Sequence, residues 1–137
     1  MAERRPNRPR TPYFDEFWSY CNKEEFRLQV CKQCGEIQFP PSPVCPGCMS
    51  EEFTWEKMKG VGKIISHATF VRQYYPECVP PWPSILVALD EGTWVMSNPR
   101  DKNISEQDMK QGTRVKIAFV DAEDESGLFK IPVWAKA

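Results

Sequence analysis

The spacing of four cysteines within residues 31–48 constrains this chain more than any other feature. They lie in the run CKQCGEIQFPPSPVCPGC, as two C-x2-C pairs separated by ten residues: Cys31, Cys34, Cys45 and Cys48. Each pair can form a tight turn that points two thiolates at one ion, and Gly35, directly after the first pair, suits such a turn. Four thiolates describe a closed tetrahedral zinc site, which is structural and does not activate water.

The alternatives are two disulfides, four unrelated core cysteines, or iron in a rubredoxin-like site. The N-terminus lacks the apolar core of a signal peptide, so we expect no oxidising compartment, and metal binding is favoured over disulfides. The spacing does not separate zinc from iron. A ribbon of about 35 residues buries too little apolar surface to fold unaided, so the metal must contribute about 10 kcal/mol or more.

Charge is unevenly distributed along the 137 residues, although the net charge is only −1. Four arginines lie in the first ten residues: Arg4, Arg5, Arg8 and Arg10. Without them and Glu3, 14 basic and 18 acidic residues remain, a net charge of −4. An acidic body argues against a nucleic-acid partner. No apolar run approaches membrane-spanning length, so we expect no membrane partner and a soluble, cytoplasmic protein.

The first half of the chain divides into an arm and a helix with the ribbon. Residues 1–12 are rich in arginine and proline and are predicted to be a flexible arm. From Tyr13 to Phe26 the apolar spacing predicts a helix, and residues 13–52 are predicted to hold this helix and the zinc ribbon. This aromatic helix face either packs on the second domain of the same chain or, in part, contacts another protein, since aromatic residues are enriched at interfaces. The candidate interface residues are Phe14, Phe17 and Trp18.

Residues 53–137 have the sequence pattern of short β-strands throughout. Predicted strands are Phe53–Met58, Gly62–Val71, Ser84–Leu89, Thr93–Ser97, Thr113–Val120 and Leu128–Trp134. Ser105 to Asp108 resembles a capping box that opens one short helix before the fifth strand. Short strands with one late helix predict an oligomer-binding (OB) fold, a Greek-key β-barrel. The fold class is therefore mainly β: an N-terminal helix and zinc ribbon followed by an OB-fold domain over residues 53–137.

No combination of residues predicts a catalytic site, and we expect none. His67 is the only histidine and is best explained as an ordinary strand residue. Cys21 lies on the apolar helix face, and Cys78 has no neighbouring base that would lower its pKa. The acidic cluster at 121–125 is predicted to be a solvated hairpin tip.

The segment 72–83 is too apolar for an ordinary exposed loop. It carries Arg72, Tyr74, Tyr75 and Trp82 among four prolines. Prolines reduce the entropy lost when a loop is ordered, and aromatic rings supply contact area for a flat or apolar ligand. The loop is therefore predicted to be the wall of a binding site.

In order and spacing, the chain resembles the DUF35 family of acyl-CoA-associated ribbon and OB-fold proteins over about residues 13–135. The resemblance is carried by the cysteine run, Trp55, GVGKIIS at 60–66, LVALDEG at 86–92, GTRV at 112–115 and FKIPVW at 129–134. Two departures are the dense prolines at 76–83 and a long acidic hairpin at 121–126.

The resemblance implies a non-catalytic accessory subunit that is inactive alone. Its partner would be the thiolase-fold catalytic subunit of an acyltransferase or aldolase complex, in a heterotetramer that acts on aromatic, steroid or fatty acyl-CoA. The resemblance also leaves open an acyl-CoA hydratase as the partner. The zinc would be structural, and the coenzyme A thioester would lie against the OB domain near Arg72, Tyr74 and Trp82. Two other classes stay open: a module that binds single-stranded nucleic acid on aromatic rings, and a rubredoxin-like electron carrier.

Overall fold

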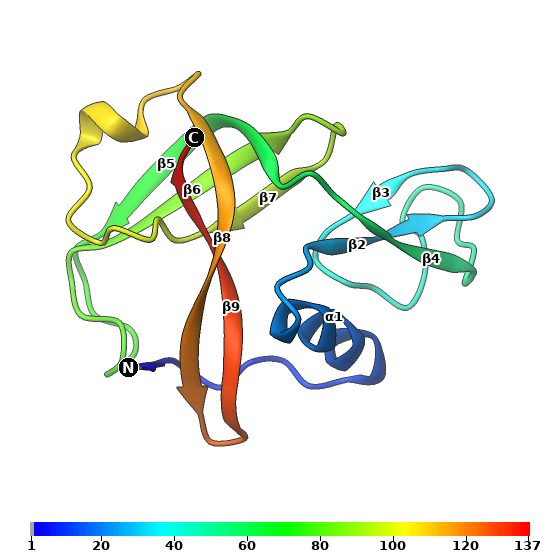
Figure 1. The fold of residues 1–137 in the computed structure, drawn as a ribbon, viewed down its shortest axis with the longest axis horizontal. Helices are drawn as coiled ribbons and strands as arrows, with labels where there is room; N and C mark the ends of the chain where they lie inside the picture. The colour runs from blue at the N-terminus through cyan, green and yellow to red at the C-terminus, as the bar shows by residue number, and fades with distance from the viewer. Residues whose placement is uncertain (1) are drawn as a thin grey trace.

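The computed structural model describes residues 2–137, which form two β-sheets with one α-helix between them (Figure 1). The helix α1 spans Pro12–Asn22. The strands are β1 (Glu3–Arg4), β2 (Arg27–Cys31), β3 (Ile37–Gln38), β4 (Phe53–Lys57), β5 (Val61–Phe70), β6 (Trp82–Leu89), β7 (Trp94–Ser97), β8 (Arg114–Asp124) and β9 (Gly127–Lys136). Within residues 2–137, no helix has the length and apolar character needed to cross a membrane.

Helix α1 starts where the sequence predicts and ends earlier. The hydroxyl of Thr11 accepts a hydrogen bond of 3.2 Å from the Phe14 N–H, which caps the first turn, and Pro12 occupies a position that tolerates proline. The helix stops at Asn22, and Glu24 adopts a left-handed conformation with φ of 59°. This turn redirects the chain into β2, so the predicted helical residues after Asn22 belong to the connection.

The smaller sheet has the order β3-β2-β4 and carries the cysteine ribbon. Strand β4 pairs with β2 over five residues, from Arg27 opposite Lys57 to Cys31 opposite Phe53. The sequence predicts this strand as part of the OB domain, and its pairing with β2 shows that this prediction is wrong. Alternation alone identifies a strand but not the neighbour with which it pairs.

Five strands close into a barrel with the connectivity of an OB fold, which confirms the predicted fold class. Strand β5 pairs with β6 and with β8, β6 pairs with β7, and β8 pairs with β9. A parallel bridge between Pro99 and Trp134 joins the end of β7 to β9 and closes the barrel. The short helix between β7 and β8 is a 3₁₀ helix, Glu106–Met109, and its cap is Ser105 as predicted.

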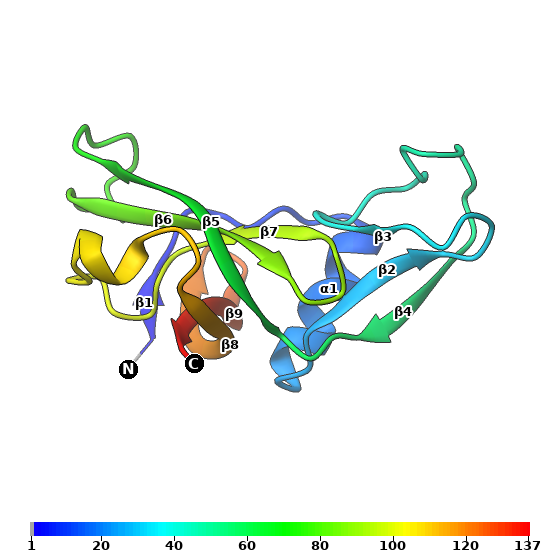
Figure 2. The same ribbon diagram turned by 90° about the horizontal axis from the view of Figure 1, so that it is seen from above.

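The barrel and the ribbon share one hydrophobic core. Phe17 and Cys21 of α1 belong to the same buried cluster as Leu28 of the ribbon and Ile64 and Trp134 of the barrel. Figure 2 shows α1 between the two sheets. The relative position of the two parts is therefore set by apolar packing, which stabilises the fold in proportion to the area buried.

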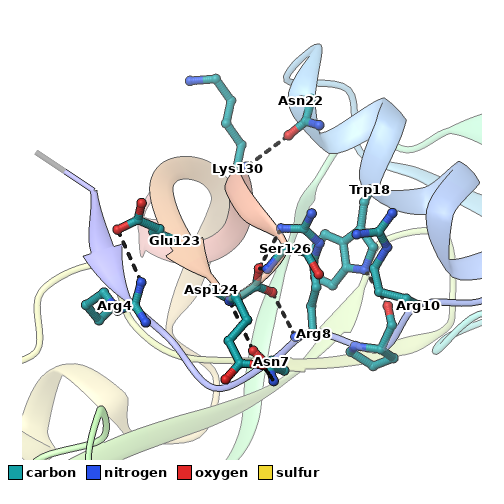
Figure 3. A network of polar contacts seen from close by, with 12 residues as sticks. Arg4, Asn7, Arg8, Arg10, Trp18, Asn22, Glu123, Asp124, Ser126 and Lys130 are labelled. Atoms are coloured by element: carbon teal, nitrogen blue, oxygen red, sulfur yellow. Dashed lines mark hydrogen bonds and ion pairs between the residues drawn. The ribbon is translucent and has the colours of Figure 1, made fainter.

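Residues 2–12 of the N-terminal arm are ordered, which corrects the prediction of a flexible segment. Strand β1 pairs in parallel with β8, with Glu3 opposite Ala122 and Arg4 opposite Glu123. Arg5 is buried, at 7% of its full exposure. The arm then crosses the β8–β9 hairpin and reaches α1, where the Trp18 indole N–H donates to the Pro9 carbonyl at 3.1 Å (Figure 3). A composition rich in arginine and proline predicts disorder. Composition carries no information on the distant residues that hold the arm in place.

The acidic hairpin also differs from the prediction. Strand β8 continues through Asp124, so three of the four acids expected at a solvated tip lie in a paired strand. Asp124 is fully buried, and only Glu125 and Ser126 form the tip. The arm covers this side of the hairpin, which is why a carboxylate can be buried there.

Candidate functional site

The four ribbon cysteines converge on one point. Their sulfur atoms all lie within 4.8 Å of one another. The Sγ–Sγ distances are 3.5 Å between Cys31 and Cys48 and 3.6 Å between Cys34 and Cys45. A tetrahedron with Zn–S bonds of about 2.3 Å would place sulfurs about 3.8 Å apart, whereas a disulfide needs about 2.05 Å. All six cysteines in the described part of the chain are free, and the set of four fits a tetrahedral metal.

The two C-x2-C turns have the same backbone pattern. The N–H of Gly35 donates to the Cys31 carbonyl at 2.9 Å, and the N–H of Met49 donates to the Cys45 carbonyl at 2.8 Å. Gly35 and Met49 both follow the second cysteine of their pair, and both have positive φ, 78° and 66°. The sequence indicated this conformation only at Gly35, because a methionine gives no signal for it.

The four sulfurs lie so close together that a bound cation is needed for all of them to be ionised. The Cys34 N–H lies 3.5 Å from the Cys31 sulfur and, as the leading cause, lowers the pKa of Cys31 to about 6. At Cys34 the Glu36 N–H acts in the same direction, but the neighbouring Cys45 sulfur and burial outweigh it and raise the pKa to about 12. Crowded sulfurs therefore do not all ionise by themselves. A divalent ion on four thiolates removes this repulsion, and such a site holds the ribbon together without offering an open coordination position.

A second feature is an apolar cavity of about 370 Å³ at the edge of the barrel where β5 ends and β6 begins. Its walls include four aromatic residues and two arginines: Phe70, Tyr74, Tyr75, Trp82, Arg5 and Arg72. The structure thus brings together Arg72, Tyr74 and Trp82, which the sequence singled out. It adds Arg5 from the arm and Phe70 from the end of β5. The sequence carried no signal for Arg5, because it reaches the cavity from a distant part of the chain, whereas Phe70 directly precedes the proline-rich segment and was counted with the preceding strand.

Trp82 contacts two cations at one wall of this cavity. The Arg5 guanidinium lies 5.1 Å from the ring centroid, and the Lys102 ammonium lies 4.8 Å from it. The Glu3 carboxylate forms ion pairs with both. Arg5 also donates to the Asn98 side chain at 2.7 Å. This network fixes the arm against the barrel and orders the wall that carries Trp82.

The remaining residues that the sequence analysis considered have separate environments. His67 lies on β5 with an exposed side chain. Burial raises the pKa of Cys78, which lines the cavity, and raises that of Cys21 to about 12, so neither thiol is activated as a nucleophile. The three helix aromatics differ: Phe17 is buried inside the chain, whereas Phe14 and Trp18 are partly exposed.

The ribbon and the whole chain both have recognisable relatives. Residues 18–54 match the family model described as the ChsH2 rubredoxin-like zinc ribbon domain. A DUF35 domain-containing scaffold protein of Pyrococcus furiosus is 31% identical over 122 residues, 82% of this chain and 83% of the relative. A similarly named protein of Methanocaldococcus jannaschii is 29% identical over 65% of this chain and 63% of the relative.

Two further comparisons are informative. A probable enoyl-CoA hydratase alpha subunit of Thermomonospora curvata is 27% identical over 95% of this chain, but the match spans only 40% of that longer relative. Among solved structures, a chain of the Ltp2-ChsH2(DUF35) aldolase superposes with a TM-score of 0.79 at 22% identity, covering 95% of this chain and 98% of that one. The identity and coverage shared with the Pyrococcus furiosus protein show that this chain belongs to the DUF35 family.

Proposed function

We propose that this chain is the non-catalytic accessory subunit of a complex that transforms acyl-CoA thioesters, and that its partner is a thiolase-fold catalytic subunit. The proposal also includes a heterotetrameric assembly and zinc as the ribbon metal. The names of the relatives support the accessory role, since one is named a probable enoyl-CoA hydratase alpha subunit, two are named scaffold proteins and one is part of an aldolase.

The observation that carries the proposal is the division of the molecule into a structural metal centre and an apolar cavity. The four thiolates would occupy all positions of a tetrahedral ion, so the metal would hold the ribbon and would not polarise a substrate. The cavity offers aromatic rings and arginines instead of an activated nucleophile or base. Such a surface can hold and orient a thioester while another subunit supplies the reacting groups.

Within this proposal, the cavity side of the barrel faces the acyl-CoA. Arg72 is exposed at the cavity, with its guanidinium 5.9 Å from the Tyr74 ring centroid, where a cation can meet an anionic or carbonyl group of the ligand. Trp82 would supply the apolar wall. The cations that hold Trp82 are already paired with Glu3, so their main role is to keep this wall rigid.

The exposed parts of α1 form the proposed contact with the catalytic subunit. Phe14 and Trp18 are partly exposed, while Phe17 packs against the Phe26 and Phe39 rings and serves the core. Truncation of Phe14 should therefore weaken assembly with little loss of stability, whereas truncation of Phe17 should unfold the helix–ribbon packing. Partner affinity and thermal stability, measured for both alanine variants, separate the two roles.

The experiment that tests the proposed function is identification of the native partner. The tagged chain is purified from its own cells at low salt, and the co-purifying protein is identified, expressed and recombined with it. We expect a thiolase-fold protein in a defined stoichiometric complex that turns over an acyl-CoA. A complex with no acyl-CoA activity, or a native state without a partner, would contradict the proposal.

A further inference from the structure

The outer face of the β5–β6–β7 sheet is apolar although it is exposed. Alternation along these strands buries Ile64, Val87 and Val95 inside the barrel and turns the residues between them outward. Cross-strand pairing places the outward residues side by side, and we call them the outer face: Lys63, Ser66, Ala68, Phe70, Trp82, Ser84, Leu86, Ala88, Trp94 and Met96. Seven of these ten residues are apolar and only Lys63 is charged, whereas the solvated face of an antiparallel sheet is normally polar.

Residues 2–137 leave much of this face uncovered. Trp94 and Met96 are each 61% exposed, and Phe70 is 46% exposed. Of the nine large apolar residues that the described part of the chain exposes, seven lie on these three strands or on the loop between β5 and β6: Phe70, Val71, Tyr74, Tyr75, Val79, Trp94 and Met96. Exposed apolar residues gathered on one side of a protein mark an interaction surface.

The position of the aromatic cavity indicates which molecule covers this surface. The cavity lies at one end of the outer face, because Phe70 and Trp82 belong to both. In the proposed function, another subunit brings its reacting groups to a ligand held at this cavity. That subunit must therefore reach the cavity and the sheet face that continues from it. A second copy of this chain on the outer face would instead separate the cavity from the catalytic subunit.

The charge on the outer face also disfavours a second copy. Lys63 is exposed, in the same cross-strand row as Ala88 and Trp94. The nearby Asp90 is already held by Arg114 through two hydrogen bonds of 2.8 Å, so the Lys63 ammonium stays available. The outer face carries no acid, so a second copy of it would place no carboxylate opposite Lys63. A complementary partner surface is apolar and carries a carboxylate at this point.

We propose that the outer face of β5–β6–β7 docks the catalytic subunit, through an apolar surface of that subunit with a carboxylate opposite Lys63. This inference rests on the proposed function and deepens it by adding the barrel sheet to the contact made by α1. Trp94 and Met96 lie outside the aromatic cavity and are the main anchors of this contact. Tryptophan and methionine are among the residues enriched at protein interfaces.

The first test is hydroxyl-radical footprinting of the full-length, zinc-loaded chain, alone and in complex with the protein that co-purifies with it. We expect oxidation of Met96 and Trp94 to fall about fivefold or more in the complex, because oxidation follows exposure. Met49, which is 70% exposed on the ribbon, is the internal reference and should react equally in both samples. Unchanged oxidation of Met96, or equal protection of Met96 and Met49, would overturn the inference.

The second test measures the affinity of the same partner for variants of the outer face. Met96→Lys places a charge on the apolar surface and should weaken the complex about thirtyfold. The matched control is Leu128→Lys, the same change at a residue that is 70% exposed at the start of β9, outside the outer face. Both side chains are exposed, so both variants should fold, and circular dichroism with zinc content verifies this. Equal affinity of the parent chain and Met96→Lys, or an equal loss in Leu128→Lys, would overturn the inference.

The charge prediction is tested with Lys63→Glu. This variant should weaken the complex about tenfold at low salt and less at high salt, because salt screens the repulsion between two carboxylates. An affinity that is unchanged at low salt would overturn the assignment of a carboxylate opposite Lys63.

The outcomes separate this inference from the proposed function. If the complex turns over acyl-CoA but forms equally well with Met96→Lys, only the docking assignment fails. If the complex depends on Met96 but does not turn over acyl-CoA, only the proposed function fails. Self-association of the purified chain that Met96→Lys abolishes would identify a second copy as the occupant and would overturn the inference.

Discussion

Asp124, at the end of β8, is joined to Arg8 in the N-terminal arm, 116 residues away in the sequence. The Arg8 backbone N–H donates to the Asp124 carboxylate at 3.0 Å, and the Arg8 guanidinium lies 3.5 Å from the same carboxylate (Figure 3). The guanidinium also lies 4.1 Å from the centroid of the Phe129 ring. One carboxylate thus holds the arm to the hairpin against which α1 packs.

Loss of the Asp124 charge should destabilise the chain substantially. The carboxylate is fully buried, and removing one partner of a buried ion pair leaves an uncompensated charge, which typically costs about 3–5 kcal/mol. We expect Asp124→Asn to lower the free energy of unfolding by about 2–4 kcal/mol, since the amide oxygen can still accept one hydrogen bond. Urea denaturation measures the change.

The matched control is Asp121→Asn on the same strand. Asp121 is exposed and pairs with Lys130 at 3.1 Å, so its loss should cost less than about 1 kcal/mol. Similar losses in both variants would show that the arm contributes nothing beyond ordinary surface pairing.

Removal of one ribbon thiolate should remove the metal and unfold the ribbon. We expect one zinc per chain in the parent protein and a strongly reduced metal content in Cys45→Ser, because the binding free energy of the metal is the folding free energy of this part. Cys78→Ser, which lies outside the cluster, should retain the full metal content. Elemental analysis together with circular dichroism provides the measurement; a Cys45→Ser protein with unchanged metal content would contradict the assignment, and iron in the parent would contradict the choice of zinc.

Local patterns in the sequence were sufficient to predict the ribbon and the barrel. The paired C-x2-C turns define their own ligand geometry, and period-two alternation with a Ser105 cap identified the OB-type strands and the short helix between β7 and β8. The cavity was foreseen in part, because Tyr74 and Trp82 stand in one short proline-rich segment whose composition is unusual for a loop.

These local patterns do not predict which residues or strands that are distant in the sequence contact one another. The arm looks disordered by composition, but Arg5 and Arg8 each contact an aromatic ring that lies elsewhere in the chain, and Arg8 also pairs with the distant carboxylate of Asp124. Strand β4 likewise has the alternation of a barrel strand, and only its pairing with β2 assigns it to the ribbon sheet. Sequence patterns report periodicity and turn chemistry, whereas these features depend on which distant segments meet.

Docking of the arm at the cavity should weaken in acid. Burial alone would raise the pKa of Glu3, but hydrogen bonding to Lys102 and the charge of Arg5 outweigh it and hold the pKa below its ordinary value of 4.5. A lowered folded-state pKa means that Glu3 contributes its full stabilisation above about 4.5 and loses it as the pH falls through the lower folded-state value. The Arg5 Nε–H resonance and amide exchange in the arm should report this loss.

The control for this pH dependence is Glu3→Gln. Other carboxylates with lowered pKa values, such as Asp90 beside Arg114, also titrate in acid and affect global stability. The Glu3→Gln chain should therefore still unfold in acid over the same pH range as the parent chain. Its arm resonances and arm amide exchange should no longer show the additional change below pH 4.5. An arm profile identical to that of the parent chain would assign the change to other groups.

The most direct test of the accessory role compares the turnover of acyl-CoA by the purified chain alone with turnover by its reconstituted complex. We predict no turnover by the chain alone and turnover by the complex. We also predict that His67→Ala and Cys78→Ser change the rate of the complex far less than the roughly 100-fold expected when a general acid–base or nucleophile is removed. Turnover by the isolated chain, or a loss of that size from either substitution, would contradict the account.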